Sequence, residues 1–296
     1  MIEISGLIEQ ARNHMTDNKM SQAKFAGAIG VSESTFSRWL QQTYPNMDTV
    51  SEKVQEYLEK EELRRQNVGK LEFVMTNVAK QVWNVLEYTR LQRTIGIIYG
   101  DAGIGKTATA KEWAKGKSDV VMITATPAFA NPKPFLKLLA RAFKTTRTGT
   151  MDDVYLDILD KLESRDVTLI IDEAQHLTIQ SLEIVRSLND STGTAIVMIG
   201  NEVVYNKMLG KQKAEFAQLF SRIGMRSSLS TEMLRKEDAA AVFGLTDGPE
   251  LDYLHSICNS RFGLRGAVHV WVNASNNEDT SLAGLKGMAK QMGILV

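Results

Sequence analysis

Residues 94–114 read TIGIIYGDAGIGKTATAKEWA, and this stretch decides the fold. It contains the pattern G-x-x-x-x-G-K-[ST], after an apolar run typical of a β-strand and before a helical pattern. Glycines let the backbone turn tightly and aim its N–H groups at a phosphate, and the following helix adds its positive dipole end. The pattern therefore predicts a loop that binds the phosphates of a nucleotide. Its residues are Gly100, Asp101, Ala102, Gly103, Ile104, Gly105, Lys106 and Thr107.

Within this loop, we expect Lys106 to reach the β- and γ-phosphates and the Thr107 hydroxyl to bind Mg²⁺. A second apolar run, in TLIIDEAQHL, ends in Asp172 and Glu173, about 65 residues after the loop. We expect Asp172 to complete the magnesium site and Glu173 to polarise the attacking water. An acidic pair after a strand is also typical of a helix N-terminus, where acids favour the helix dipole. The phosphate loop upstream favours the catalytic interpretation.

A third polar position follows the apolar run AIVMIG, which ends just before Asn201. Polar side chains at the carboxyl end of a parallel strand lie beside the ligand crevice. Asn201 is therefore predicted to position the water that attacks ATP. Asparagine is also a common turn residue at strand ends, so a turn remains the alternative.

The chain has 296 residues, of which 43% are hydrophobic and 24% charged, as in an ordinary globular protein. We divide it into a helical domain (1–58), a charged linker or exposed helix end (59–70), an α/β core (71–231) and a helical lid (232–296). In the core, short apolar runs alternate with helical patterns, which predicts a parallel sheet. The predicted strands are Thr94–Tyr99, Val120–Thr124, Thr168–Asp172, Ala195–Gly200 and Met225–Ser230.

Composition excludes several classes of protein. No apolar run reaches the ~18 residues that a membrane helix needs, and the first ten residues do not read as a secretory signal. We therefore expect a cytoplasmic protein. The single cysteine, Cys258, excludes an intrachain disulfide and any multi-cysteine metal site. The 35 basic and 35 acidic residues give a formal net charge of zero, so any contact with DNA must come from a local patch.

The phosphate loop, the Asp-Glu strand end and the polar strand end, in this order, resemble the AAA+ ATPase superfamily over about residues 71–296. The resemblance implies an α/β fold with a parallel five-stranded sheet of order 5-1-4-3-2 and a helical lid, with ATP and Mg²⁺ as ligands. It also implies oligomers in which an arginine of one subunit reaches the neighbour's γ-phosphate. The segment FAQLFSRIGMRSS offers Arg222 for this role and Arg226 as a second candidate; the alternative is a surface arginine. The segment SRFGLRGAVHVWVNAS offers Arg265, or else Arg261, as a lid arginine at the subunit's own nucleotide.

The N-terminal segment 21–42, SQAKFAGAIGVSESTFSRWLQQ, has a helix-turn-helix pattern and resembles the repressor-type domains of phages. Gly30 suits the turn, and Ser32 suits the start of the second helix. If that helix enters a major groove, the residues facing DNA include Ser34, Thr35 and Arg38. The acids of residues 1–58 outnumber the bases, which favours the alternative of a helical bundle used for protein contacts. The apolar residues expected to close its core are Phe25, Ile29, Val31, Phe36 and Trp39.

A basic segment follows the second predicted strand. KPFLKLLARAFKTTR, residues 133–147, has apolar residues at helical spacing, five basic residues and no acid. A basic face repeated along an oligomer would follow a DNA backbone without reading bases, whereas a single solvated helix face is the alternative. The basic residues are Lys133, Lys137, Arg141, Lys144 and Arg147, with a second, weaker cluster at Lys207, Lys211 and Lys213.

The combination of a helix-turn-helix domain and a compact AAA+ ATPase is similar to the family of phage Mu transposition protein B. The segments GDAGIGKTATA, IIDEAQHL, LFSRIG and LRGA carry this resemblance over nearly the whole chain. It implies a protein of the bacterial host cytoplasm that binds double-stranded DNA without sequence preference, forms homo-oligomeric filaments on it with ATP, and recruits and activates a DDE-type transposase at target DNA. The resemblance also implies that the transposase stimulates ATP hydrolysis.

Two other functions remain open from the residues alone. One is a helicase loader or replication initiator, which needs a partner helicase and often prefers single-stranded DNA. The other is a transcription regulator with a nucleotide-sensing domain, which binds one operator tightly and turns over little ATP. The presence of Glu173 and Arg222 favours ATP hydrolysis over nucleotide sensing alone.

Overall fold

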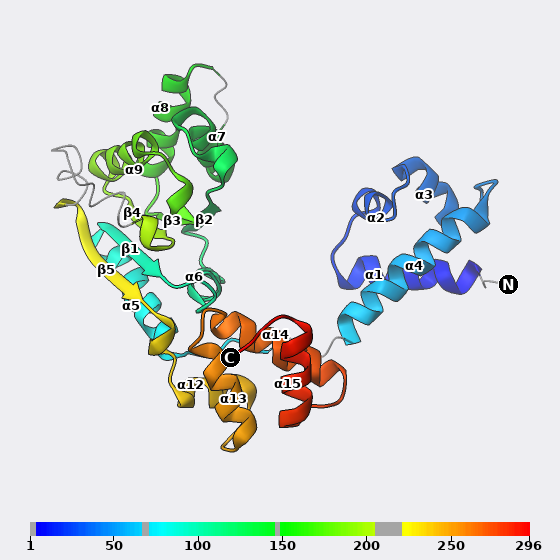
Figure 1. Cartoon of the computed structure of the whole chain (residues 1–296). Helices are drawn as coiled ribbons and strands as arrows, with labels where there is room; N and C mark the ends of the chain where they lie inside the picture. Colours follow the sequence, from blue (N-terminus) through cyan, green and yellow to red (C-terminus); the bar gives the residue numbers. More distant parts are fainter. Residues whose placement is uncertain (1–3, 67–70, 146–148, 205–220) are drawn as a thin grey trace. The chain divides into compact units, whose positions relative to one another are not determined.

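The computed structural model describes residues 4–66, 71–145, 149–204 and 221–296 (Figure 1). The chain divides into two compact units, residues 1–70 and 71–296, which are described separately. The predicted DNA contacts Arg147, Lys207 and Lys211, together with Lys213, lie outside the described residues.

The N-terminal unit contains the predicted helix-turn-helix. Gly30 takes a left-handed backbone (φ 68°) in the turn, and the Ser32 hydroxyl accepts a hydrogen bond from the Thr35 N–H at the start of the second helix. Phe25, Phe36 and Trp39 are fully buried and stacked, and the Trp39 indole donates to the Ser51 hydroxyl at 2.9 Å. The helices are α1 (Ile4–Asp17), α2 (Gln22–Ala28), α3 (Glu33–Leu40) and α4 (Met47–Gln66).

The predicted core of this unit is confirmed, since Phe25, Ile29, Phe36 and Trp39 are buried and Val31 packs against them. Helix α4 continues to Gln66, so residues 59–66 are helical. The first part of the charged stretch, residues 59–66, is therefore the C-terminal end of α4.

The second unit is built on one five-stranded sheet of order β2-β3-β4-β1-β5, in which every neighbouring pair is parallel. This is the predicted order 5-1-4-3-2 read from the other edge, so the predicted fold class is confirmed. β5 begins two residues earlier than predicted, at Ile223, which pairs with Ile95 of β1. The strands are β1 (Ile95–Gly100), β2 (Val120–Thr124), β3 (Thr168–Asp172), β4 (Ala195–Ile199) and β5 (Ile223–Leu229).

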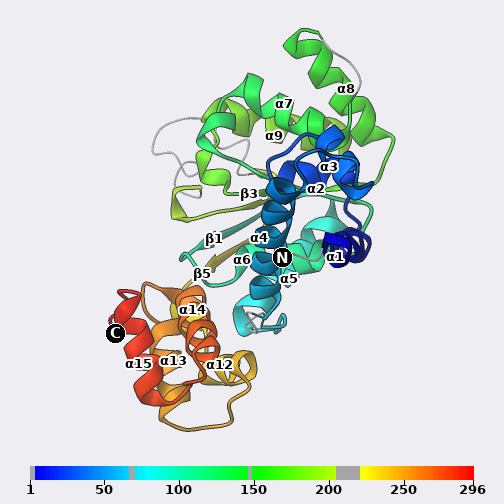
Figure 2. The ribbon, with the colours of Figure 1, turned by 90° about the vertical axis from the view of Figure 1, so that its right-hand side faces the viewer.

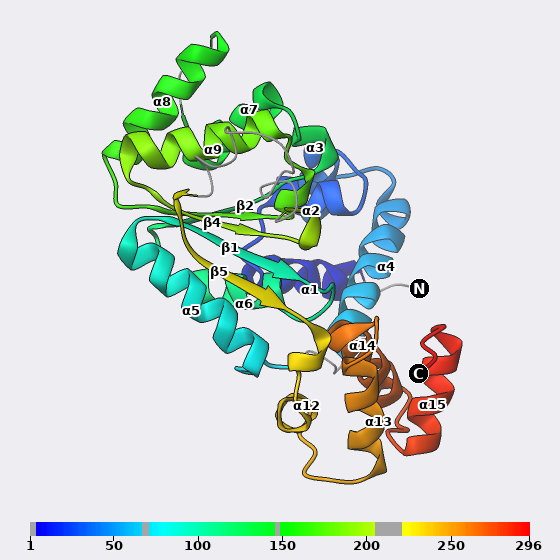
Figure 3. The same ribbon diagram turned by 60° about the vertical axis from the view of Figure 1, so that its left-hand side comes forward.

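Helices cover both faces of the sheet, as Figures 2 and 3 show. Successive residues of β1 point to opposite faces: Ile97 packs in the core beneath α7 and α9, and Ile98 packs in the core beneath α5 and α6. Burial on both sides explains the continuous apolar runs of the central strands. The helices are α5 (Asn77–Gln92) and α6 (Lys106–Ala114) on one face, and α7 (Pro132–Phe143), α8 (Met151–Glu163) and α9 (Ile179–Thr192) on the other.

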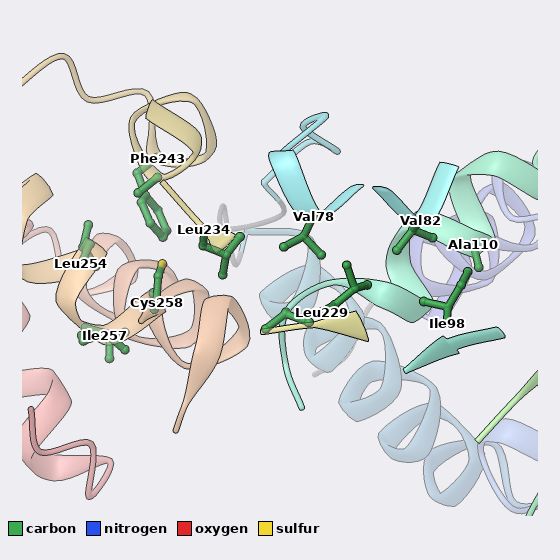
Figure 4. Packing of buried hydrophobic residues seen from close by; sticks show 14 of the residues in the cluster. Val78, Val82, Ile98, Ala110, Leu229, Leu234, Phe243, Leu254, Ile257 and Cys258 are labelled. Carbon is green, nitrogen blue, oxygen red and sulfur yellow. The ribbon is translucent and has the colours of Figure 1, made fainter. Parts of the chain in front are cut away.

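The lid follows the carboxyl end of β5 and shares a core with the sheet (Figures 3 and 4). Leu234, Phe243 and Ile257 of the lid belong to the same buried cluster as Val78 of α5 and Leu229 of β5. This shared core fixes the lid beside the carboxyl ends of the strands. The lid helices are α12 (Lys236–Phe243), α13 (Pro249–Cys258), α14 (Gly263–Asn276) and α15 (Leu282–Gln291). In the described ranges no helix has the length and apolar character needed to cross a membrane.

Candidate functional site

A cavity of about 340 Å³ opens where the phosphate loop, the ends of β3 and β4, and lid helix α14 meet. Its position at the carboxyl ends of parallel strands is the usual ligand crevice of such a sheet. Its lining brings together most of the predicted nucleotide residues. The full set of lining residues is Gly100, Ala102, Gly103, Gly105, Lys106, Thr107, Ala108, Asp172, Glu173, Gln175, Gly200, Asn201, Leu264, Arg265 and Val268.

Two glycines allow the close packing of the loop. Gly100 has φ 133°, and a Cβ there would strike the Leu229 carbonyl of β5. Gly103 has φ 75°, and a Cβ there would lie 3.1 Å from the carbonyl oxygen of Phe262 in the lid. The buried Ile104 side chain anchors the loop in the hydrophobic core. The loop is therefore held between β5 and the lid, with the N-terminus of α6 opening directly behind it.

The Lys106 side chain folds back over the phosphate loop and contacts its backbone. Its Nζ donates to the carbonyl oxygens of Gly100 (3.0 Å) and Asp101 (2.5 Å). Burial lowers the pKa of Lys106, against the opposing effect of the Asp101, Glu173 and Asp172 charges. A phosphate beside the ammonium group would add negative charge that stabilises this partly buried cation.

Thr107 and Asp172 are brought together although 65 residues separate them. The Thr107 hydroxyl lies 3.0 Å and 3.2 Å from the two carboxylate oxygens of Asp172, which is itself 3% exposed. Burial raises the pKa of Asp172, and the hydrogen bond from Thr107 opposes this shift. One hydroxyl and one carboxylate fit Mg²⁺, which keeps several waters and takes phosphate oxygens as further ligands. The described residues contain no group of three or more His, Cys, Asp or Glu that would form an all-protein metal site.

Glu173 and Asn201 both line the cavity, from the ends of β3 and β4. Glu173 has an unusual left-handed backbone (φ 55°, ψ 34°) at the point where β3 ends. The Asn201 side-chain oxygen accepts from the Val203 N–H at 2.9 Å, so this residue also has the predicted turn role. A carboxylate and an amide on adjacent strand ends are suited to holding a water between them.

Gln175 is a polar residue of the cavity that was not predicted from the sequence. Its amide lies between Glu173 and the backbone of Asn201. A signal was present in the sequence, since Gln175 follows the Asp-Glu pair by two residues in DEAQHL. The sequence alone nevertheless does not show where the glutamine side chain points, because this depends on the conformation of the turn.

The two lid arginines have different surroundings. Arg265 lines the cavity, and its backbone N–H donates to the Gly103 carbonyl at 2.9 Å. The Arg261 guanidinium instead lies over the Phe262 ring, 4.9 Å from its centroid. This geometry favours Arg265 as the lid arginine beside the phosphate loop.

Arg222 lies outside this cavity, just before the first residue of β5. Its Nε donates to Asp190 of α9 at 2.5 Å, and its side chain is 51% exposed. The phosphate loop meets the other end of β5, where the Asp101 N–H donates to the Leu229 carbonyl. The seven residues of the strand span roughly 20 Å, so the Arg222 head cannot reach the phosphates of its own subunit. Arg226 is also exposed and lies in the middle of the strand, beside Ile97 of β1.

Two described groups of candidate DNA contacts are on the surface. On α7, Phe135, Leu136 and Leu139 are buried, which confirms the predicted amphipathic helix. On α3, Arg38 is exposed, and the hydroxyls of Ser34 and Thr35 bond to the Ser32 hydroxyl at the start of the helix. The exposed basic residues of the α7 segment are Lys133, Lys137, Arg141 and Lys144.

Comparison with known proteins decides the family. An AAA domain model matches residues 89–209. The Mu-like prophage FluMu DNA transposition protein B of Haemophilus influenzae is 31% identical over 88% of this chain and 93% of its own length. This chain belongs to the Mu transposition protein B family. A second member, the ATP-dependent target DNA activator B of Escherichia phage Mu, is 30% identical over 89% of this chain and 86% of its own length.

Solved structures agree with the family in fold alone. The ORC1 protein of Aeropyrum pernix, solved in complex with DNA, has a TM-score of 0.55 at 13% identity, over 77% of this chain and 69% of that one. A Walker-type ATPase of Pyrococcus abyssi has a TM-score of 0.51 at 14% identity, over 75% of this chain and 72% of that one. The AAA-type fold is therefore shared well beyond the Mu transposition protein B family.

Proposed function

We propose that this protein is an ATPase that, when ATP is bound, binds DNA without sequence preference and assembles on it. The assembled protein activates a DDE-type transposase at target DNA. The observation that carries the proposal is the match to family members named for DNA transposition and target DNA activation. That match includes part of the N-terminal unit, because residues 71–296 make up only about three quarters of the chain. The nucleotide cavity supports the same function.

The proposed hydrolysis divides the roles among the cavity residues. The phosphate loop and Lys106 hold the phosphates of ATP, and Arg265 approaches them from the lid of the same subunit. Mg²⁺ bound near Thr107 and Asp172 would offset the negative charge of the phosphates. Glu173 polarises the attacking water, and Asn201 orients it from the end of β4.

Assembly of subunits is needed because one subunit cannot bring its own Arg222 to its own nucleotide cavity. Arg222 lies where β5 begins, at the amino ends of the strands, so it would contact only the γ-phosphate of a neighbouring subunit. ATP at that interface would then join two subunits, and its hydrolysis would weaken the contact. The ion pair with Asp190 holds Arg222 on the surface in the single subunit.

The proposal is tested by electron microscopy of the protein on random-sequence duplex DNA with ATP and with ADP. Ordered assemblies that coat the DNA with ATP and disappear with ADP are the expected result. Occupancy of a single site in a longer DNA would instead identify a transcription regulator. Preference for single-stranded DNA would favour a helicase loader. Addition of the partner DDE-type transposase is expected to raise ATP turnover.

Helix α7 supplies the proposed DNA-binding surface. Lys137 and Arg141 are exposed, four residues apart, on the face opposite to the buried Phe135 and Leu139. Changing both to glutamate is expected to reduce DNA affinity at least tenfold at 0.1 M salt and to lower the salt slope by about 2. The measurement is fluorescence anisotropy with random duplex DNA and ATP, over a range of salt concentrations.

The matched control is the pair Lys286→Glu and Lys290→Glu on α15, which makes the same change in charge on another exposed helix. The control is expected to keep both the affinity and the salt slope. Equal loss in both double variants would mean that overall charge, not α7, governs binding. An unchanged salt slope in the α7 variant would show that this helix does not contact phosphate.

A further inference from the structure

Gln175 hydrogen-bonds to Glu173 and to the backbone of Asn201, the two residues to which the proposed function assigns the attacking water. It belongs to the short turn Ala174–His176 that follows β3, and it lines the nucleotide cavity. Its side-chain Nε2 donates to Oε2 of Glu173. Its Oε1 accepts from the backbone N–H of Asn201 at 3.3 Å. One amide therefore joins the end of β3 to the end of β4.

The direction of this amide is set by its partners. A backbone N–H only donates, so the glutamine oxygen must face Asn201. An ionised carboxylate only accepts, so the glutamine NH₂ group must face Glu173. Neither end can be exchanged without placing two donors or two acceptors against each other.

The backbone around Gln175 supports the same arrangement. The left-handed conformation of Glu173 starts a tight turn, in which the His176 N–H donates to the Glu173 carbonyl at 3.1 Å. Gly200 faces the turn from β4, and a Cβ there would strike Oε1 of Gln175 and a methyl of Val204. Gly200 is not among the glycines with positive φ, so its small size, and not an unusual backbone, makes room for the amide.

We propose that Gln175 is a positioning residue for ATP hydrolysis: it holds the Glu173 carboxylate at a fixed place relative to the Asn201 end of β4. The inference rests on the proposed function, in which Glu173 polarises the water. Glu173 is exposed, and its flexible side chain has several rotamers unless a neighbour fixes it. Small misplacement of a catalytic group costs up to about 100-fold in rate, so this contact acts on the rate of hydrolysis and not on ATP affinity.

The first test replaces Gln175 by methionine, which has a similar length and forms neither hydrogen bond. The kcat for ATP hydrolysis on DNA is expected to fall about tenfold, with KM and the Kd for ATP within about twofold of wild type. Gln175→Glu keeps an acceptor for Asn201 but turns a carboxylate toward Glu173, so its kcat is expected to fall at least as far. The matched control is Gln180→Met, at an exposed position on α9 outside the cavity.

A second variant displaces the amide without changing Gln175. Gly200→Ala places a methyl group against Oε1 of Gln175 and against the buried Val204 methyl, so the glutamine end must move. Circular dichroism and thermal unfolding show whether the variant keeps its fold. This variant is expected to lower kcat with little change in ATP affinity. A wild-type kcat in a folded Gly200→Ala protein would overturn the proposed role.

The Glu173→Gln variant separates this inference from the function on which it rests. Single-turnover hydrolysis is measured for Glu173→Gln alone and combined with Gln175→Met. Gln175 acts through Glu173 if the second substitution changes the residual rate by less than about twofold; an equal tenfold loss in both backgrounds would overturn the inference. Wild-type turnover by Glu173→Gln alone would instead refute the proposed role of Glu173. Loss of turnover in Glu173→Gln with wild-type kcat in Gln175→Met would overturn the role of Gln175 and leave that of Glu173 intact.

Discussion

Replacing Arg222 by alanine is expected to lower ATP turnover on DNA about a thousandfold while leaving the affinity of the isolated subunit for ATP unchanged. The loss is large because an arginine at the γ-phosphate stabilises charge that develops as the phosphoryl group is transferred. ATP affinity is retained because Arg222 lies beyond the amino end of β5, about one strand length from the phosphate loop of its own subunit. Steady-state turnover and ATP titration of the DNA-free protein are the two measurements.

Mixing two inactive variants tests whether this arginine acts between subunits. Arg222→Ala keeps an intact phosphate loop, and Lys106→Ala keeps an intact Arg222. If the site is shared, mixtures regain activity at interfaces where the loop of the first variant meets the arginine of the second. Mixtures that stay inactive while still assembling would refute the shared site. Arg226→Ala is the control on the same strand, and a loss confined to that variant would make Arg226 the trans-acting residue.

Replacing Lys106 by alanine is expected to weaken ATP binding on the order of 100-fold. Lys106 is the cation within the loop, and its charge-assisted hydrogen bonds to phosphate are worth about 1.5–3 kcal/mol each. The nucleotide-free protein is expected to keep its stability, because the cost of burying this ammonium group opposes its two bonds to loop carbonyls. The assembly on DNA is lost together with ATP binding.

Thermal unfolding with and without MgATP measures this effect directly. ATP at 100 times its Kd stabilises the wild-type protein by about 2.7 kcal/mol, whereas the variant with a 100-fold weaker Kd is expected to gain only about 0.4 kcal/mol at the same concentration. Lys115→Ala, at the exposed end of the same helix, is the control and is expected to respond like wild type. Equal stabilisation of the Lys106→Ala protein by MgATP would contradict the assigned role.

The phosphate loop and the strands could be predicted because their determinants are contiguous in the chain. The loop needs glycines, a lysine and a hydroxyl within eight residues, between a strand and a helix. The buried strands β3 and β4 are continuous apolar runs because helices cover both faces of the sheet. The start of β5 was less predictable, because it is an edge strand with alternating exposure and its first pairs depend on β1.

By itself, then, the sequence determined that this chain has a phosphate loop, an acidic strand end and an amphipathic basic helix, since each depends on residues close together in the chain. Tertiary structure alone decided three relations among distant residues. The parallel pairing of β5 with β1 placed Arg222 beside the start of β1, at the opposite end of the strands from the phosphate loop. The packing of the lid brought Arg265, and not Arg261, to the loop. The turn after β3 directed Gln175 toward both Glu173 and Asn201. Such relations follow from how whole elements pack, and local spacing does not specify them.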